Sequence, residues 1–301
     1  MNLDSLGESL IPVVKGNGYG LGRRHLTERV AATSPVIAVG TVYETVDVVD
    51  LAQRVLVLTP TLDDHLDALA TSKVTLTVGS VAQVQHLVDA RWHGEVAVKV
   101  ASSMLRHGLA VDDVADSLRL GDLNVVAFAI HPPLAGDAAD HLAEIERLSA
   151  RLPGAAEVHV SHVPVEAFLH LAATHPDRGW KLRLGTALWH GDKSTMHLQA
   201  DVLDIRPVTA GTTVGYRQFA VPSDGHLAII GAGSAHGVVP LPDGLSPFHF
   251  ARQRLPLIEG PHMHVSMAFV TAGDPCPAVG DLVDVQRPLI SVTPDRVVWM
   301  S

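Results

Sequence analysis

Short apolar runs alternate with segments of helical periodicity from the start of the chain to about residue 192. Each run is a few residues long and rich in valine, isoleucine and leucine, which is typical of buried strands. The runs are 11–15, 36–40, 55–58, 74–78, 95–100, 125–130, 157–161 and 181–185. The helical segments are 23–32, 42–53, 81–90, 111–118, 142–152 and 165–173. Eight strands with intervening helices predict an α/β fold, a (β/α)8 TIM-like barrel, over residues 1–192.

The pattern changes after Asp192, where helical periodicity ends. Residues 193–301 are rich in valine, glycine and proline, and turn signals separate short strand-like runs. These runs are 198–205, 212–221, 226–230, 264–270, 282–285 and 297–300. The pattern predicts a mostly-β C-terminal domain.

Composition narrows the classes of function. The chain has 301 residues with a net charge of −10, which argues against a nucleic-acid surface. No apolar run approaches the roughly 20 residues of a membrane helix, and Met1 to Leu10 lack the pattern of a signal peptide. The single cysteine, Cys276, cannot form an internal disulfide and fits a reducing compartment. We therefore expect a cytoplasmic protein that binds neither nucleic acid nor membranes.

The first strand-like run ends on Lys15, and four glycines follow within seven residues. A lysine is costly to bury at such a position without a partner. A desolvated amine has a lowered pKa and can form a Schiff base, so this position suits covalent chemistry. A strand-end lysine that merely reaches solvent is the simpler alternative.

Residues that follow the other strands should gather on the same rim, because active groups of such barrels lie after the strands. This rule selects Lys99, Arg106, His131, Ser161, His162, Arg183, Gly185 and Thr186. Their cationic members suit an anionic ligand, such as a phosphate together with a carboxylate.

The segment from Pro12 to Gly22, PVVKGNGYGLG, resembles the cofactor-lysine motif of the alanine racemase family. Enzymes of this family use pyridoxal 5'-phosphate (PLP) and are built from a barrel and a β domain. The resemblance implies that Lys15 holds PLP and that Tyr19 reaches its phosphate. Glycine replaces both alanines of the family motif, and Leu21 replaces its histidine.

Two further barrel segments are similar to this family. KVASSMLRHG (99–108) resembles the segment whose arginine contacts the phenolic oxygen of PLP and the substrate, which implies these roles for Arg106. Lys99 matches a lysine that some members carbamylate, but Ala101 and Ser103 replace the family's aspartate and glycine. An amine paired to a nearby carboxylate is the alternative for Lys99.

LRLGTALWHG (182–191) resembles the segment whose arginine faces the pyridine nitrogen, here Arg183. A guanidinium can only donate to that nitrogen, which weakens the ring as an electron sink and disfavours side reactions such as transamination. The resemblance also implies that the N–H groups of Gly185 and Thr186 bind the phosphate.

Two strand-end positions match the family less specifically. His131 resembles the histidine that packs on the pyridine ring, with a core histidine as the alternative. Ser161 is expected to add a hydroxyl to the phosphate site, and His162 remains the alternative there.

In the β domain, TVGYR (213–217) resembles the segment that carries the family's second catalytic base, here Tyr216. Racemisation needs a proton removed on one face of the α-carbon and delivered on the other, which implies the pair Lys15 and Tyr216. Val265 to Met267 resembles the segment whose methionine N–H receives the substrate carboxylate. In the family these groups enter the site from the other subunit, so the resemblance implies a homodimer.

Other positions depart from the family. Ala232 lies where a pocket tyrosine is usual, Ala268 replaces an aspartate, and Arg217 replaces a glycine. We expect such a pocket to admit an amino acid larger than alanine, or alanine loosely. Relatives carry residues before the first strand and a further C-terminal stretch, so we expect a trimmed or late N-terminus here.

The resemblance implies a PLP-dependent isomerase that interconverts L- and D-amino acids. A PLP-dependent lyase or aldolase on the same scaffold is one alternative. Metal-assisted members of such groups use a His–Cys site, but His262 and His264 have no cysteine at ligand spacing, so no zinc is expected. A PLP-binding relative without catalysis is the other alternative.

Overall fold

The computed structural model describes residues 4–63, 65–66, 69, 72–154 and 156–299. The chain divides into two compact units, Met1–Gly191 and Asp192–Ser301. In the described part of the chain, no helix is long and apolar enough to cross a membrane.

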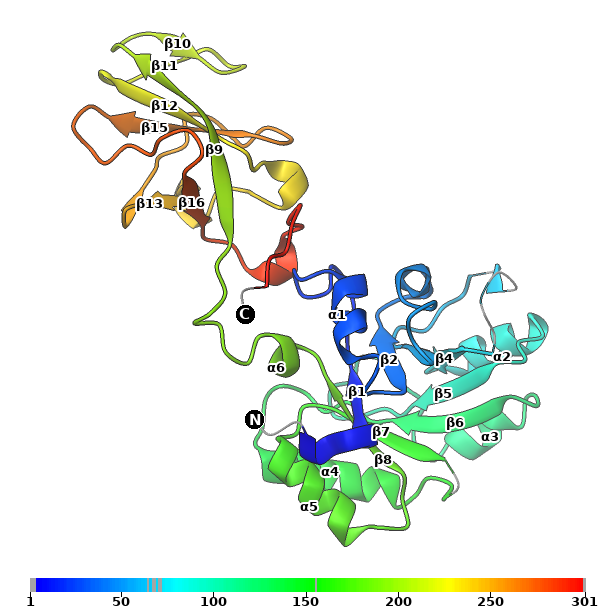
Figure 1. The fold of residues 1–301 in the computed structure, drawn as a ribbon. Coiled ribbons are helices and arrows are strands. Elements are labelled where there is room, and N and C mark those ends of the chain that lie inside the picture. Colours follow the sequence, from blue (N-terminus) through cyan, green and yellow to red (C-terminus); the bar gives the residue numbers. More distant parts are fainter. Residues whose placement is uncertain (1–3, 64, 67–68, 70–71, 155, 300–301) are drawn as a thin grey trace. The chain divides into compact units, whose positions relative to one another are not determined.

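The first unit is built around eight parallel strands. Figure 1 shows the sheet with the helices that connect its strands. The strands are β1 (Leu10–Pro12), β2 (Val36–Val39), β3 (Arg54–Val57), β4 (Val74–Val78), β5 (Glu95–Lys99), β6 (Asn124–Ala129), β7 (Glu157–Val160) and β8 (Trp180–Leu184). Their order in the sheet is β1-β8-β7-β6-β5-β4-β3-β2. A parallel bridge between Val13 and Ala38 joins β1 to β2 and closes the sheet on itself. The predicted α/β barrel is confirmed.

The helices of this unit connect the strands. They are η1 (Asp4–Ser9), α1 (Arg23–Val30), η2 (Val42–Asp47), α2 (Val81–Asp89), α3 (Val114–Leu118), α4 (Ala138–Ser149), α5 (Val165–Thr174) and α6 (Thr186–Trp189). The helix predicted over 42–53 is wrong, because only the 3-10 helix η2 forms there. Its β-branched residues lose rotamer freedom in an α-helix. Likewise, α3 begins only at Val114 rather than at residue 111.

The strand register decides which side chains enter the barrel. Partners in neighbouring parallel strands point to the same face, and successive residues alternate between faces. Arg183 pairs with Ile11, and Ala129 pairs with both Lys99 and His159. These side chains face the interior, so the polar residues of β5, β7 and β8 point into the barrel.

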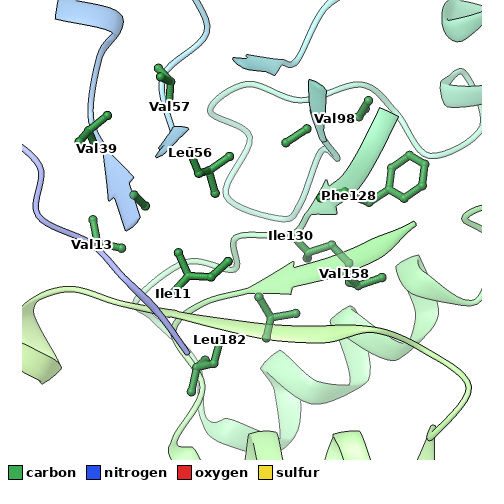
Figure 2. Close-up of a cluster of buried hydrophobic side chains, with 14 of the residues drawn as sticks. Ile11, Val13, Val39, Leu56, Val57, Val98, Phe128, Ile130, Val158 and Leu182 are labelled. Carbon is green, nitrogen blue, oxygen red and sulfur yellow. The ribbon is translucent and has the colours of Figure 1, made fainter. Parts of the chain in front are cut away.

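The alternate positions form a continuous apolar layer. Buried members of this core that Figure 2 labels include Val39, Val57, Val98, Phe128, Ile130, Val158 and Leu182. Burying a side chain of this size contributes about 1.5–3 kcal/mol. This apolar layer therefore contributes to the stability of the barrel, together with the buried apolar residues on the interior face, among them Ile11, Val13 and Leu56.

The second unit holds a six-stranded antiparallel sheet and a separate hairpin. The sheet has the order β14-β13-β16-β9-β12-β15, and the hairpin is β10-β11. The strands are β9 (Gln199–Val208), β10 (Thr213–Val214), β11 (Phe219–Ala220), β12 (Gly225–Ile230), β13 (Phe248–Phe250), β14 (Gln253–Arg254), β15 (Ser266–Thr271) and β16 (Leu282–Val285). Three 3-10 helices complete it, η4 (Ser234–His236), η5 (Pro242–Gly244) and η6 (Leu289–Ser291). Its core gathers around Val202, Ala228, Ile230, Phe248 and Ala268.

Two sequence predictions for this unit are wrong. The run 212–221 is a hairpin rather than one strand, because Gly215 turns the chain with a φ of 74°. Residues 297–299 form no strand, and the last residue of that predicted run, Met300, lies outside the described residues. The pattern also missed β13 and β14, which are too short to show a period.

Candidate functional site

The loop after β1 turns sharply and presents Lys15 at the barrel mouth. Gly18 has a φ of 63°, and a Cβ there would lie 2.4 Å from the Arg23 nitrogen, so only glycine fits. The Asn17 side chain accepts a hydrogen bond from the Gly20 N–H at 3.0 Å, which fixes the turn. The Lys15 side chain is exposed, whereas the sequence suggested a buried amine.

The surroundings of Lys15 act mainly to lower the pKa of its amine. Partial desolvation in the barrel mouth lowers the pKa of Lys15, and the charges of Arg106 and Arg183 lower it further. The Glu44 carboxylate acts in the opposite direction on that pKa. Glu44 is itself held by the backbone, because it accepts from the Gly40 N–H at 2.7 Å and from the Gly16 N–H at 3.2 Å.

His131, Ser161 and Arg183 form one row of side chains at the ends of β6, β7 and β8. His131 Nδ1 is hydrogen-bonded to Ser161 Oγ. Arg183 donates to Ser161 Oγ at 3.4 Å and to the carbonyl of Ile130 at 3.0 Å. The strand register predicts this row, since Val160 pairs with Leu182 and the next residues therefore lie side by side.

Ser161 and Arg183 are buried, His131 is half-buried, and the row carries one charge. Desolvation by burial, and after it the charge of Arg183, lowers the pKa of His131 to about 2, so this ring is neutral at physiological pH. Burial, followed by the charge of Arg106, lowers the pKa of Arg183 to about 10, so the guanidinium stays protonated. Arg183 Nε is buried and has no hydrogen-bond partner among the described residues.

His162 lies beside this row but belongs to a different contact. It adopts a φ of 61° and donates from Nδ1 to the carbonyl of Pro132 at 2.9 Å. Its ring lies 4.3 Å from that of His131, centroid to centroid. Ser161, rather than His162, therefore joins Arg183 and His131 directly.

Lys99 is the most strongly perturbed lysine of the mouth. Its side chain is buried at 5% exposure, and its Nζ lies 3.2 Å from His107 Nε2. Burial, and then the charges of Arg106 and Arg183, lowers the pKa of Lys99 to about 7. The partner of Lys99 is thus a histidine, in place of the carboxylate weighed from the sequence.

The loop after β5 explains how His107 reaches back to Lys99. The Leu109 N–H donates to the carbonyl of Lys99 at 2.9 Å, and the Ala101 N–H donates to the carbonyl of Leu109 at 2.8 Å. The intervening residues therefore fold over Lys99, and Arg106 remains exposed on this loop.

Tyr19 and Gly185 meet where the loop after β1 passes the end of β8. Tyr19 is buried, and burial raises its pKa to about 12. Its hydroxyl would lie 1.9 Å from a Cβ at position 185, so Gly185 leaves the space that the phenol fills. His190 donates to the carbonyl of Tyr19 at 2.8 Å and fixes its backbone, and Thr186 begins the short helix α6.

In the second unit, the β10-β11 hairpin presents Tyr216 with 86% of the residue exposed. The buried Glu259 accepts hydrogen bonds from the N–H groups of Tyr216 at 2.9 Å and Arg217 at 3.2 Å. His262 donates to the same carboxylate at 2.6 Å, and its ring lies 4.4 Å from that of Tyr216.

His262 and His264 were considered from the sequence as neighbours on one strand face. Residues 262–264 precede β15 and form no strand, so the alternation does not apply. His262 turns to Glu259, whereas His264 packs edge-on against His236. Among the described residues, no three His, Cys, Asp or Glu side chains form a group that could hold a metal ion.

Met267 lies on β15, the edge strand of the six-stranded sheet. Its carbonyl accepts from the Ile258 N–H at 3.0 Å, and both groups of one strand residue point to the same side. The Met267 N–H is therefore directed away from β12. Ala232 and Ala268 are both buried in the core of this unit.

An open depression of about 530 Å³ lies under the hairpin. Met267 and Gly215 belong to its lining, together with Arg206 and Gln218. The depression therefore adjoins both segments of this unit that the sequence selected, residues 213–217 and 265–267.

The structure adds residues that the sequence did not select. Glu44 holds the backbone next to Lys15, whereas His107, His190 and Glu259 contact the predicted residues Lys99, Tyr19 and Tyr216. These contacts join residues that lie between 8 and 171 positions apart in the chain. No sequence motif marks any of the four residues.

The barrel mouth fits PLP on two observations. Four basic side chains, Lys15, Lys99, Arg106 and Arg183, lie close enough there for the charges of the arginines to lower the pKa values of both lysines, and the Glu44 carboxylate acts on Lys15 in the opposite direction. The unpaired Arg183 Nε is a buried donor that an aromatic ring nitrogen could satisfy.

Comparison with known proteins agrees with this description. The family model "Alanine racemase, N-terminal domain" matches residues 2–192. An alanine racemase of Dinoroseobacter shibae is 27% identical over 241 residues, which cover 75% of this chain and 68% of that protein.

Solved structures show the same fold. An alanine racemase from Bartonella henselae with covalently bound pyridoxal phosphate has a TM-score of 0.69 and 21% identity, covering 95% of this chain and 91% of that chain. The biosynthetic alanine racemase of Pseudomonas aeruginosa has a TM-score of 0.68 and 19% identity, covering 96% and 91%. Because the family model spans more than half of the sequence, the chain belongs to the alanine racemase family.

Proposed function

We propose that the protein is a PLP-dependent amino-acid racemase in which Lys15 and Tyr216 act on opposite faces of the α-carbon. The observation that carries this proposal is the hydrogen-bonded row of His131, Ser161 and Arg183, with a buried and unpaired Arg183 Nε, in a barrel whose first strand leads to Lys15. Family membership supports the cofactor class.

The barrel residues divide the work of holding the cofactor. Lys15 would bind PLP covalently through its amine, and Arg183 would donate to the ring nitrogen. The neutral His131 would pack on the ring without adding a second charge. When bound, PLP supplies an electron-withdrawing ring that makes the α-hydrogen of an amino acid acidic.

Other groups of the mouth would bind the anionic parts of the ligands. Tyr19 and Ser161 offer hydroxyls to the phosphate, and Gly185 and Thr186 offer backbone N–H groups. Arg106, exposed at the mouth, would contact the phenolic oxygen of the cofactor and the substrate carboxylate.

Tyr216 and Met267 would complete the site of a second subunit. Tyr216 is exposed, as a residue that acts on a neighbouring chain must be, and the edge position of β15 leaves the Met267 N–H directed away from the sheet. We therefore propose a homodimer with shared sites. The substrate would be a small amino acid. Ala232 and Ala268 do not widen its pocket, because both are buried in the core of the second unit.

Lys99 has two chemical states open to it. A neutral amine is the form that reacts with carbon dioxide, and a pKa of about 7 makes that form abundant. The resulting carbamate would place a negative charge beside Arg106 and Arg183. The other state is the neutral amine hydrogen-bonded to His107.

The test begins with the cofactor. Purified protein is incubated with PLP and reduced with borohydride, and peptide mass analysis should find the added mass on Lys15. Lys15→Ala should abolish it. An unchanged mass in the wild-type protein would contradict the cofactor proposal.

The reaction is then measured with a chiral assay over a panel of L-amino acids, together with deuterium exchange at the α-position. Tyr216→Phe should lose nearly all racemisation while it keeps the cofactor absorbance. Unchanged α-proton exchange in that variant would contradict the two-base mechanism. Release of a cleaved product would identify a lyase or aldolase, and bound cofactor without turnover would identify a binding protein.

A further inference from the structure

A buried carboxylate holds the turn that carries Tyr216. Glu259 has 4% of its side chain exposed and is the only glutamate in residues 193–301. Its Oε1 accepts from the Tyr216 N–H, and its Oε2 accepts from the Arg217 N–H. Two consecutive backbone groups are thus fixed by one side chain 43 residues away.

The turn has no room to move toward this carboxylate. A Cβ at position 215 would lie 2.2 Å from Glu259 Oε1, and Gly215 has a φ of 74°. Glycine therefore allows the backbone to approach the carboxylate closely enough for both hydrogen bonds.

His262 links the same carboxylate to the phenol ring. It hydrogen-bonds to Glu259 Oε1 at 2.6 Å, and its ring lies against that of Tyr216 at 4.4 Å and 41°. Burial acts to raise the pKa of Glu259, but the hydrogen bonds from His262 and from the Tyr216 and Arg217 N–H groups outweigh it and lower this pKa. The carboxylate is therefore ionised at neutral pH and accepts all three bonds.

We propose that Glu259 and His262 are positioning residues for Tyr216, which fix the backbone and one ring face of the phenol before a substrate arrives. This proposal rests on the proposed function of Tyr216 as a catalytic base. Without the two residues, an exposed tyrosine would sample several rotamers about χ1. A base must be held within hydrogen-bond reach of its proton, so such sampling would slow the proton transfer.

The role of each residue predicts a different loss. Glu259→Gln offers one acceptor oxygen and an amide NH2 that cannot accept, so at least one of the two backbone bonds is lost. His262→Phe keeps a ring against Tyr216 but loses the bond to Glu259. We expect the first variant to be the more damaging.

The experiment uses the PLP-loaded protein and compares both variants with two controls. Asp274→Asn removes an exposed carboxylate of the same unit, and His197→Phe replaces an exposed histidine. Hydrogen–deuterium exchange is followed by mass spectrometry on the peptide that covers residues 213–218. The kinetic constants kcat and KM are measured for the amino acid that the wild type racemises best.

We expect faster exchange in residues 213–218 in Glu259→Gln, and a kcat about 10²-fold lower with KM little changed. His262→Phe should show a smaller fall in kcat, and the controls should match the wild type. Cofactor absorbance should be equal in all five proteins, which separates positioning of Tyr216 from damage to the barrel.

Normal kcat in both variants of an active enzyme would overturn the proposal, as would rapid exchange of this peptide in the wild type. A KM increase with unchanged kcat would also overturn it, because it would assign the two residues to substrate binding. If the wild type turns over no amino acid while residues 213–218 are protected from exchange, the proposed function fails. The hydrogen bonds by which Glu259 holds the turn would then still be supported.

Discussion

Replacing Lys99 by methionine should stabilise the protein, and the gain should shrink as the pH rises. The Lys99 side chain is 5% exposed, and burial with the nearby charges of Arg106 and Arg183 lowers its pKa from 10.5 to about 7. Between these two values the unfolded chain binds more protons than the folded protein, so stability rises with pH.

The magnitude follows from the two pKa values. At pH 7 the shift destabilises the folded state by about 4 kcal/mol, and at pH 9 by about 2 kcal/mol, at 1.36 kcal/mol per unit. The penalty is greatest below pH 7 and disappears above pH 10.5. Lys99→Met keeps the aliphatic chain and removes the ionisation, so its advantage over the wild type should fall by about 2 kcal/mol between pH 7 and pH 9.

Urea unfolding of the two proteins without cofactor, in buffer free of carbon dioxide, measures this difference. Lys193→Met changes an exposed lysine and should stay within about 0.5 kcal/mol of the wild type. A difference between Lys99→Met and the wild type that does not vary with pH would refute the reasoning. If the Lys99 amine forms a carbamate, added bicarbonate should stabilise only the proteins that retain Lys99. Unchanged protein mass and unchanged stability in bicarbonate would show that Lys99 forms no carbamate.

Three further predictions concern close contacts and charge. Gly185→Ala should lower the free energy of unfolding by about 1–3 kcal/mol, because its Cβ would overlap the Tyr19 hydroxyl, whereas Gly154→Ala, with nothing within 4 Å, should change it by less than about 1 kcal/mol in the same urea titration. Gly215→Ala should also lower the free energy of unfolding by about 1–3 kcal/mol, because its Cβ would force the turn away from the Glu259 carboxylate. A stability equal to that of the wild type would contradict this close contact. Arg183→Met should raise the pKa of His131, measured by NMR titration, yet leave it below 6.5, because burial is the larger cause of its lowered pKa. An unchanged pKa of His131 in this variant would contradict the contribution of Arg183.

The alternation of short apolar runs was enough to predict the barrel, because each strand is buried on both faces and therefore reads as continuous. The rule that active groups follow the strands selected Lys99, His131, Ser161 and Arg183, and the structure brings the last three together. Strand ends are local features of a sequence, so their side chains can be read from it.

The missed features depend on contacts between distant segments. The bond between Tyr216 and Glu259 spans 43 residues, and nothing in the sequence near either residue marks it. His107 lies only eight residues from Lys99, but it reaches that amine because the loop folds back through the Leu109 backbone bond. Helix 42–53 failed for the opposite reason, since its apolar spacing suggested a helix that its β-branched residues do not favour.

The charges at the barrel mouth oppose the stability of the fold. Lys15, Lys99 and Arg183 each have a lowered pKa, and for each the first cause is desolvation and the next is the charge of Arg106. Groups that lower one another's pKa destabilise the folded state whenever they are protonated. An anion bound among them would reverse the sign of that interaction, because an opposite charge favours the protonated forms. The same cations that weaken the barrel are therefore the groups that would bind a phosphate and a carboxylate, and the burial of apolar side chains on both faces of the sheet must offset their cost.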